Sequence, residues 1–441
     1  MGRHRARAAL SGSEQAVSDT LEATYLIETP LDPAKVAETL AGEQSSGTFV
    51  RVAGESEALR ARSRATVDSL ELLEPLRTPS LPSAWLARHH PGGPWQRARI
   101  TVSFPLANIG RNLPTLWATL AGNLFDLGES TGVRLEHVAI PQAFRARFER
   151  PRHGVAGTRA LTGVAQGPLV GTIIKPNVGL DPGETAALVT QLCEAGIDFI
   201  KDDECCGDPE HAPVAQRIRA VMAAIRRHRD NTGKAVMMAF HISDEHEAML
   251  RHAELVQREG GSCVMTSLNW TGPSSVQSLR RHTDLAIHGH RNGFGMFARH
   301  PALGINFQPY ALLWRLAGVD HMHVHGLNGK FAQEDDEVIH SARHCLAPLA
   351  DPGDVADVVM PAFSSGQWAG TLPPTLDAVP SGDMLFMCGG GILAHPGGPA
   401  AGVASVRQAW AAWRAGESLE LAATRAPALQ QAIDLLGRQK G

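Results

Sequence analysis

The sequence predicts an α/β protein with a C-terminal (β/α)8 TIM barrel, preceded by an α+β, ferredoxin-like N-terminal domain. From about residue 160, eight short apolar runs alternate with helical patterns over roughly 270 residues, the usual size of such a barrel. A doubly wound sheet would show the same alternation. The polar residues favour the barrel, because they follow nearly every apolar run, at the strand ends where barrel enzymes build their sites.

The chain of 441 residues is long enough for two domains, and its 43% hydrophobic and 20% charged residues are typical of a soluble globular enzyme. We expect a disordered start at 1–20, the α+β domain at 21–148 and the barrel with a helical tail at 149–441. A net charge of −4 offers no basic field for nucleic acid, and no apolar run is long enough for a membrane span. Six cysteines without a C-x-x-C pair indicate a reduced, cytoplasmic protein.

The individual elements follow from local patterns. A helix over 32–44 is expected to begin after Asp32 with Pro33 at its first position, and a second helix is expected over 112–127. The charged segment 142–154 is expected to link the domains. The predicted N-terminal strands are ATYLIETPL, GTFVRV, TVDSLELLEP, RARITVSFPL and RLEHVAIP. The predicted barrel strands are VGTIIKP, FIKDDE, AVMMAF, CVMTSL, LAIHGH, HMHVHG, VVMPAF and LFMCGGG.

The run FIKDDE indicates a metal site. Side chains alternate along a strand, so Lys201 and Asp203 face one way and Asp202 the other, with Glu204 at the strand's end. Two carboxylates suit a hard cation such as Mg²⁺. A charged lysine would compete with that cation, and the conflict disappears if Lys201 carries CO₂ as a carbamate and so becomes a third oxygen ligand. A solvated, charged strand end is the competing interpretation.

Further candidates follow the other barrel strands. Lys175 ends the first strand and suits a proton donor or acceptor, a phosphate ligand or a Schiff-base amine, unless it is a surface lysine. Lys330 follows His323 by seven residues (330 − 323 = 7) in a loop that can close over a ligand. Arg291 and His323 suit a phosphate dianion. The turns after the seventh and eighth strands can bind phosphate through backbone N–H groups, and their candidate residues are Ser364, Gly366, Gly389 and Gly390.

Histidines are dense on the fifth and sixth barrel strands. Zinc is therefore the rival metal, although some of these side chains are expected to be structural. The histidines that share a face on their strand are His288 and His290 on the fifth, and His321, His323 and His325 on the sixth.

These segments, in this order, resemble the large subunit of ribulose-bisphosphate carboxylase/oxygenase (RuBisCO) from about Thr24 to Gly416. The matching motifs are GTIIKPNVGL, AGIDFIKDDE, HGHRNGF, GVDHMHVHGLNGKF, MPAFSSG and CGGGILAHPGG, and AGIDFIKDDE is highly specific. The resemblance implies that Lys201 is the carbamylated lysine and that it holds Mg²⁺ with Asp203 and Glu204. It implies that Lys175 is the acid/base lysine, that His290 acts on substrate hydroxyls and that Lys330 is the loop lysine. The resemblance also implies that the substrate or its phosphate groups are contacted by Arg291, His323, Ser364, Gly366, Gly389 and Gly390.

The segment AGEQSSGTF resembles the part of the family that reaches into the partner's active site. The resemblance therefore implies an obligate head-to-tail homodimer, or a larger oligomer of such dimers. The contacts from the partner chain would be Glu43, Thr48, Phe49 and Asn123.

The departures from the family pattern bear on the reaction. The carboxylase has a second lysine where this chain has Asn177, which becomes a candidate ligand contact without the charge that would stabilise a developing anion. Phe49 replaces a tryptophan, Ser365 a glycine and Phe331 a small aliphatic residue. Such sites look like RuBisCO-like (form IV) proteins, which act as enolases or isomerases in methionine salvage, or as decarboxylases of branched sugar-acid phosphates.

We therefore expect Mg²⁺-dependent enolate chemistry on a small phosphorylated ketose or sugar acid. Decarboxylation of a branched 3-keto sugar-acid phosphate is favoured, because this chain has nearly all of the polar site residues of the carboxylase. Lys175 can also protonate the carbanion that loss of CO₂ leaves behind. The alternative is a methionine-salvage enolase or isomerase acting on methylthioribulose phosphate or diketo-methylthiopentyl phosphate. Weaker hypotheses are a true carboxylase, a zinc amidohydrolase, a Schiff-base aldolase that uses Lys175 or Lys201, and a non-catalytic scaffold.

Overall fold

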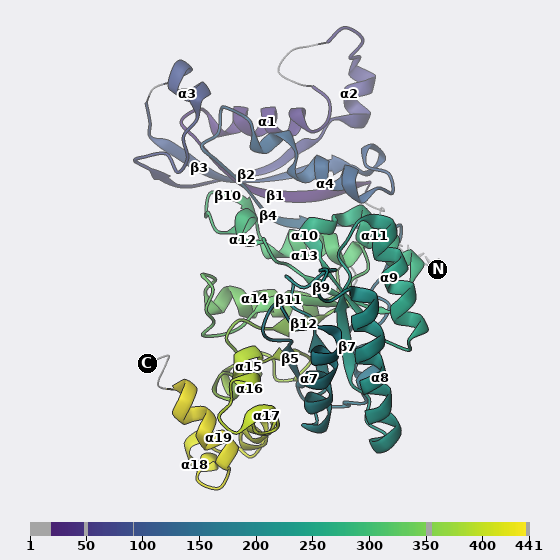
Figure 1. Ribbon diagram of the computed structural model, residues 1–441. Coiled ribbons are helices and arrows are strands. Elements are labelled where there is room, and N and C mark those ends of the chain that lie inside the picture. Colours follow the sequence, from purple (N-terminus) through teal and green to yellow (C-terminus); the bar gives the residue numbers. More distant parts are fainter. Residues whose placement is uncertain (1–18, 48–51, 91, 350–354, 438–441) are drawn as a thin grey trace, which may run out of the picture.

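The computed structural model describes residues 19–47, 52–90, 92–349 and 355–437 and shows a sheet domain joined to a closed barrel (Figure 1). Most of the predicted disordered start at 1–20 and of the predicted strand GTFVRV lies outside the described residues. The first described strand, β1, begins at Thr20.

The N-terminal domain is built on a five-stranded sheet in the order β10-β4-β1-β3-β2. Its neighbouring strands are antiparallel except β10, which comes from the barrel half of the sequence and pairs parallel with β4. Ala23, Tyr25 and Ile27 alternate along β1 and are fully buried, as expected for a sheet with a covered face. The strands are β1 (Thr20–Thr29), β2 (Thr66–Leu76), β3 (Trp95–Pro105), β4 (Gly132–Ala139) and β10 (Leu303–Ile305).

Helix α1 packs against β1, β2 and β3. Its predicted start is confirmed, since Asp32 accepts a hydrogen bond from Ala34 N at 3.0 Å and Pro33 occupies the first turn. The predicted helix over 112–127 is wrong beyond Ala121, because the backbone of Gly122 leaves the helical region and a 3₁₀ turn follows. The helical elements of this part are α1 (Pro33–Glu43), α2 (Glu57–Ser63), α3 (Ala84–His89), η1 (Leu106–Asn108), α4 (Leu113–Ala121), η2 (Asn123–Phe125) and α5 (Gln142–Arg145).

Eight parallel strands close into a barrel in the order β5-β6-β7-β8-β9-β11-β12-β13, which confirms the predicted fold class. All eight predicted runs form barrel strands, although β6 ends at Lys201, so the carboxylates of the FIKDDE run lie in the loop that follows. The strands are β5 (Leu169–Ile173), β6 (Phe199–Lys201), β7 (Met237–His241), β8 (Cys263–Ser267), β9 (Ala286–His290), β11 (His321–His325), β12 (Met360–Phe363) and β13 (Leu385–Met387).

Helices surround the barrel, and the predicted helical tail is divided into α18, α19 and the π-helical turn η5 (Figure 1). The larger helices are α6 (Gly154–Thr162), α7 (Pro182–Glu194), α8 (Val214–Thr232), α9 (His246–Arg258), α11 (Pro273–His282), α13 (Phe307–Leu316), α14 (Asp335–Leu346), α15 (Leu372–Ala378) and α17 (Gly398–Arg414). The shorter ones are α10 (Leu268–Thr271), α12 (Gly295–Ala298), η3 (Val355–Asp357), η4 (Ala369–Thr371), α16 (Gly389–Leu393), α18 (Leu419–Ala423), α19 (Pro427–Ala432) and η5 (Ile433–Gly437).

The link between the two parts is more structured than its charge suggests. Arg145, at the end of α5, is fully buried and forms an ion pair with Asp357 beside the barrel. A buried guanidinium needs such a paired carboxylate, so this contact ties the link to the barrel wall.

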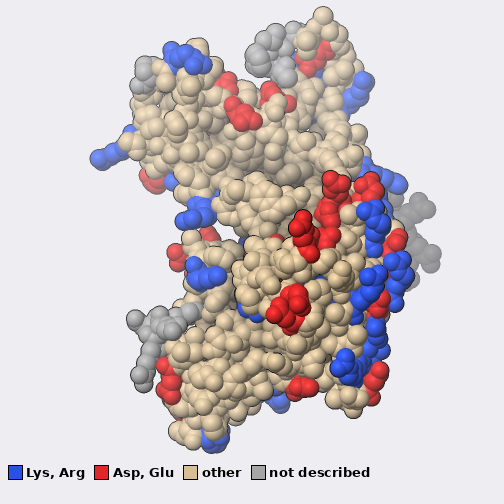
Figure 2. All heavy atoms as spheres, in the orientation of Figure 1, with Lys and Arg blue, Asp and Glu red and all other residues tan. Residues whose placement is uncertain are grey.

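On the face shown in Figure 2, Lys and Arg side chains gather along the α8–α9 edge of the barrel, interspersed with Asp and Glu. Such mixed signs do not create the basic stripe that nucleic-acid binding uses. No described helix is long and apolar enough to cross a membrane.

Candidate active site

The lysine and the two carboxylates of the FIKDDE run meet at the C-terminal end of β6. Lys201 is 1% exposed, and its Nζ lies 2.8 Å from the backbone oxygen of Asp202 and 3.4 Å from Glu204 Oε2. Burial lowers the pKa of Lys201, which favours the neutral amine. Asp203 is also buried and faces the same cavity. Two carboxylates beside a buried amine are a donor set that fits a hard divalent cation once the amine becomes a carbamate.

Asp202 faces away from this cavity, as the alternation predicted. Its Oδ2 accepts hydrogen bonds from Arg217 Nε at 3.3 Å, from Arg217 Nη2 at 3.2 Å and from the backbone N of His241 at 3.0 Å. Both side chains of this ion pair are nearly fully buried. The pair anchors the loop behind β6 and so directs the residues on either side of Asp202 into the cavity.

Lys175 lies beside the carboxylates. Its Nζ donates to Asp203 Oδ2 at 2.7 Å and to Asn177 Oδ1 at 2.6 Å. Asn177 therefore serves as a neutral acceptor for Lys175 and does not line the main cavity. The arrangement places a hydrogen-bond-donating amine within reach of a ligand held by the carboxylate cluster.

His290, at the end of β9, lies on the opposite side of the cluster. Its Nδ1 accepts from the backbone N of Asn292 at 3.3 Å, and its Nε2 lies 3.4 Å from Glu204 Oε2. Burial lowers the pKa of His290, so the neutral ring carries its proton on Nε2, facing Glu204.

Arg291 is a strong candidate for anion binding. Its Nη2 donates to Gln333 Oε1 at 2.8 Å, and its guanidinium lies over the rings of Phe294 and Phe307. Its Nε and Nη1 are buried and have no hydrogen-bond partner in the described part of the chain. Burial lowers its pKa to about 10, so the group stays charged at neutral pH and needs an anion. Gln333 was not predicted, because nothing in its sequence context marks it.

His323 differs from the expectation of a freely donating phosphate ligand. Its Nδ1 lies 3.1 Å from Ser364 Oγ and its Nε2 lies 2.8 Å from His288 Nε2, so both ring nitrogens are engaged within the protein. His288 and His321 point into the barrel core and are fully buried. The zinc hypothesis gains no support, since among the described residues no three His, Cys, Asp or Glu side chains that include these histidines bring their ligand atoms within 4.8 Å of one another.

The ends of β11, β12 and β13 complete the wall. Lys330 is exposed, and its backbone N donates to Ser365 O at 3.3 Å. The ring of Phe331 packs at a tilt against that of His325, with ring centroids 4.7 Å apart. Gly389 lies close to Lys175, because a Cβ added there would come within 3.9 Å of Lys175 Cε. The loop lysine and the glycine turn thus reach the cavity that contains the carboxylates.

One cavity of about 1290 Å³ contains most of the predicted site residues. It also extends to side chains of β4 in the N-terminal sheet, including Arg134 and His137, which were not predicted. Glu43 and Asn123 do not line it, and Thr48 and Phe49 lie outside the described residues. The predicted residues that line it are Lys175, Lys201, Asp203, Glu204, His290, Arg291, His323, Lys330, Ser364, Gly366, Gly389 and Gly390.

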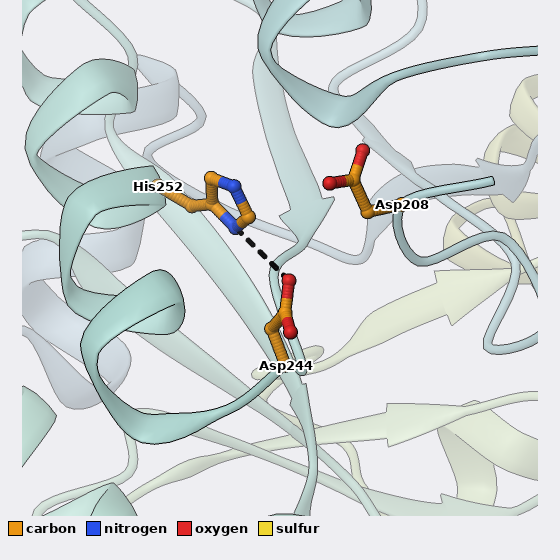
Figure 3. Close-up of side chains that lie close together, drawn as sticks. All are labelled: Asp208, Asp244 and His252. Carbon is orange, nitrogen blue, oxygen red and sulfur yellow. Dashed lines mark ion pairs between the residues drawn. The ribbon is translucent and has the colours of Figure 1, made fainter. Parts of the chain in front are cut away.

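A second group of potential ligands, Asp208, Asp244 and His252, lies apart from this cavity (Figure 3). Both aspartates are exposed, and the ion pair between His252 and Asp244 is 3.9 Å long. Asp208 accepts from Val214 N at the start of α8, and Asp244 accepts from the backbone N of Glu245. These local hydrogen bonds explain the aspartates without a bound ion.

Comparisons with known proteins agree with this geometry. Residues 15–144 match the N-terminal domain of the ribulose bisphosphate carboxylase large chain, and residues 154–436 match its catalytic domain. A 3-oxo-isoapionate-4-phosphate transcarboxylase/hydrolase of Xanthobacter autotrophicus is 46% identical over 95% of this chain and 99% of its own. A 3-oxo-isoapionate-4-phosphate decarboxylase of Rhizobium etli is 40% identical over 95% of this chain and 99% of its own.

A solved structure supports the same relationship. The crystal structure of a rubisco-like protein from Burkholderia fungorum is 64% identical, with a TM-score of 0.90, and the match covers 95% of this chain and 100% of that one. The chain belongs to the ribulose bisphosphate carboxylase large-chain family, among its RuBisCO-like members.

Proposed function

We propose that this protein is a Mg²⁺-dependent RuBisCO-like lyase that decarboxylates a branched 3-keto sugar-acid phosphate such as 3-oxo-isoapionate 4-phosphate, and that it is not a carboxylase. The names of the two relatives above support the substrate class. Decarboxylation is supported mainly by the hydrogen bond of 2.7 Å from Lys175 Nζ to Asp203 Oδ2. A proton donor there would lie beside a substrate held by the carboxylate cluster and could protonate the carbon that loses CO₂.

Lys201, Asp203 and Glu204 would hold Mg²⁺, with Lys201 as a CO₂-derived carbamate. Burial lowers the pKa of the Lys201 amine, which supports this role because only the unprotonated form reacts with CO₂. When bound, Mg²⁺ acts as a Lewis acid that polarises the ketone and stabilises negative charge on its oxygen.

The chain's own residues supply positioning and proton transfer. The C–C bond to the carboxyl group breaks, CO₂ leaves, and the electron pair remains as an enolate. Lys175 then donates a proton from Nζ to the vacated carbon, while Asn177 and Asp203 hold that amine in place. The two orphaned donors of Arg291 bind the phosphate group and so orient the carbon skeleton.

Transcarboxylation followed by hydrolysis is the second candidate, favoured by the 46% identity to the enzyme of that name against 40% to the decarboxylase. If the vacated carbon carries a hydroxyl group, the enolate is an enediolate. Once that hydroxyl loses its proton and the former ketone oxygen gains one, the former ketone carbon can add CO₂ that is kept in the cavity. Lys330, on the loop at the cavity wall, is the cation that would hold a retained carboxylate.

The site is expected to work in a homodimer. The cavity opens beside exposed apolar side chains, and Trp270 and Met296 both pack at Gly293, on its rim. A contiguous exposed apolar surface of this kind is typical of an interface, and the occupant we propose is a second copy of the chain. Sedimentation of the purified protein tests this, and a monomer at micromolar concentration would refute it.

The experiment uses substrate labelled with ¹³C in its carboxyl group, with protein incubated in Mg²⁺ and bicarbonate. A decarboxylase transfers the label to CO₂ and bicarbonate and leaves a ketose phosphate one carbon shorter. A transcarboxylase/hydrolase retains the label in one of two shorter acids. If neither product forms but the methylthio-pentyl phosphates of methionine salvage are converted, the enolase or isomerase hypothesis replaces the proposal.

A further inference from the structure

A column of buried histidines crosses the barrel core from helix α6 to the cavity. His321 Nε2 lies 2.7 Å from Thr158 Oγ1, and His321 Nδ1 lies 3.3 Å from His288 Nδ1. His288 Nε2 lies 2.8 Å from His323 Nε2, and His323 Nδ1 lies 3.1 Å from Ser364 Oγ. These contacts connect the far side of the barrel to a side chain on the cavity wall.

The direction of every hydrogen bond in the column follows from its far end. Thr158 Oγ1 also contacts Gly154 O, and a carbonyl carries no proton, so the hydroxyl proton of Thr158 lies on that contact. Thr158 must therefore accept from His321 Nε2–H. Burial lowers the pKa of His321 to about 4, so the ring is neutral and its Nδ1 is an acceptor.

The same logic continues to the cavity. His288 must donate from Nδ1 to His321, and burial also lowers the pKa of His288, which leaves its Nε2 as an acceptor. His323 must then donate from Nε2, and burial keeps this ring neutral as well, so its Nδ1 accepts the hydroxyl proton of Ser364. In the 3.4 Å contact between Ser364 Oγ and Ser365 Oγ, Ser365 must then be the donor. The hydroxyl of Ser364 therefore has no proton for a ligand and can offer it only a lone pair.

We propose that Thr158, His321 and His288 are positioning residues that, through His323, fix Ser364 as a hydrogen-bond acceptor toward the substrate. A hydroxyl group of the substrate then binds there as a donor, whereas an oxygen of the phosphate dianion is disfavoured because it offers no proton. The barrel strands and α6 hold the members of the column in place before the substrate binds. No free energy of reorganisation is therefore needed during the reaction. The effect on substrate rests on the proposed function, but the proton positions do not.

The first test is neutron diffraction from deuterated crystals of the free protein, in which deuterium on each ring nitrogen is seen directly. The expected pattern is deuterium on Nε2 of His321 and His323 and on Nδ1 of His288. Deuterium on Nε2 of His288 would overturn the proposal. Thr158→Val should abolish the fixed pattern, while Thr158→Ser, which keeps the hydroxyl, should retain it.

Thr162→Val is the matched control. Thr162 lies one turn further along α6, and its hydroxyl donates to backbone oxygens of Thr158 and Arg159 without touching the column. Its substitution should leave the proton pattern and the activity unchanged. If Thr162→Val and Thr158→Val have equal effects, the column is only structural.

The second test is a double-mutant cycle on KM for CO₂ release. Loss of one well-placed hydrogen bond is expected to raise KM about three- to tenfold in Thr158→Val. Because that effect passes through Ser364, Thr158→Val should add little in a Ser364→Ala background. Additive effects would overturn the proposal, whereas absence of any CO₂ release would contradict only the proposed function and leave the neutron result standing.

Discussion

The buried ion pair behind the carboxylate cluster gives a quantitative prediction for Arg217→Met. Arg217 is 1% exposed, and besides Asp202 it donates to the backbone oxygens of Ala212, Cys206 and Gly207. Its removal leaves the buried carboxylate of Asp202 with a single backbone donor, from His241. Breaking a buried pair from one side costs about 3–5 kcal/mol, and we expect that loss in the free energy of unfolding.

Urea unfolding followed by circular dichroism measures the effect. Arg226→Met on the same helix is the control, because Arg226 forms a half-exposed pair with Glu259 and should contribute no more than about 1 kcal/mol. Adding Asp202→Asn to Arg217→Met should recover part of the loss, since it removes the unpaired charge. A loss below about 1 kcal/mol for Arg217→Met would refute the argument that this pair anchors the loop.

Three further predictions concern the cavity. Lys201→Met should abolish bicarbonate-dependent Mn²⁺ binding measured by electron paramagnetic resonance, while Lys234→Met, at a lysine that does not line the cavity, should retain it. Asn177→Lys removes the acceptor 2.6 Å from Lys175 Nζ and adds a like charge, so CO₂ release should fall at least about tenfold without any gain of ribulose-bisphosphate carboxylation from labelled bicarbonate. Arg291→Met should raise KM about 10- to 100-fold with a smaller change in kcat, and an unchanged KM would contradict its role in phosphate binding.

Local patterns were sufficient for the barrel and for the orientation of its central motif. The period of two along a strand predicted that Asp202 faces away from Lys201 and Asp203, and its contact with Arg217 confirms this. The cap of α1 was predicted from Asp32 and Pro33, because capping depends on neighbouring residues alone.

Contacts between distant segments could not be predicted in this way. β10 pairs with β4 across some 170 positions of sequence, and nothing in Leu303–Ile305 signals that pairing. The sequence predicted which histidines face the same side of each strand. It did not predict the hydrogen bond between His288 Nε2 and His323 Nε2, because that contact depends on how the two strands are placed around the barrel. The helix expected over 112–127 ends early at Gly122, where helical periodicity alone did not mark the stop.

The central claim is that an enolate formed by loss of CO₂ is protonated at the vacated carbon. The most direct measurement is NMR of the reaction with 3-oxo-isoapionate 4-phosphate in D₂O, in the presence of Mg²⁺ and bicarbonate. We expect release of CO₂ together with one deuterium at the carbon that carried the carboxyl group. Exchange or isomerisation with every carbon retained, or no reaction of this substrate, would contradict it.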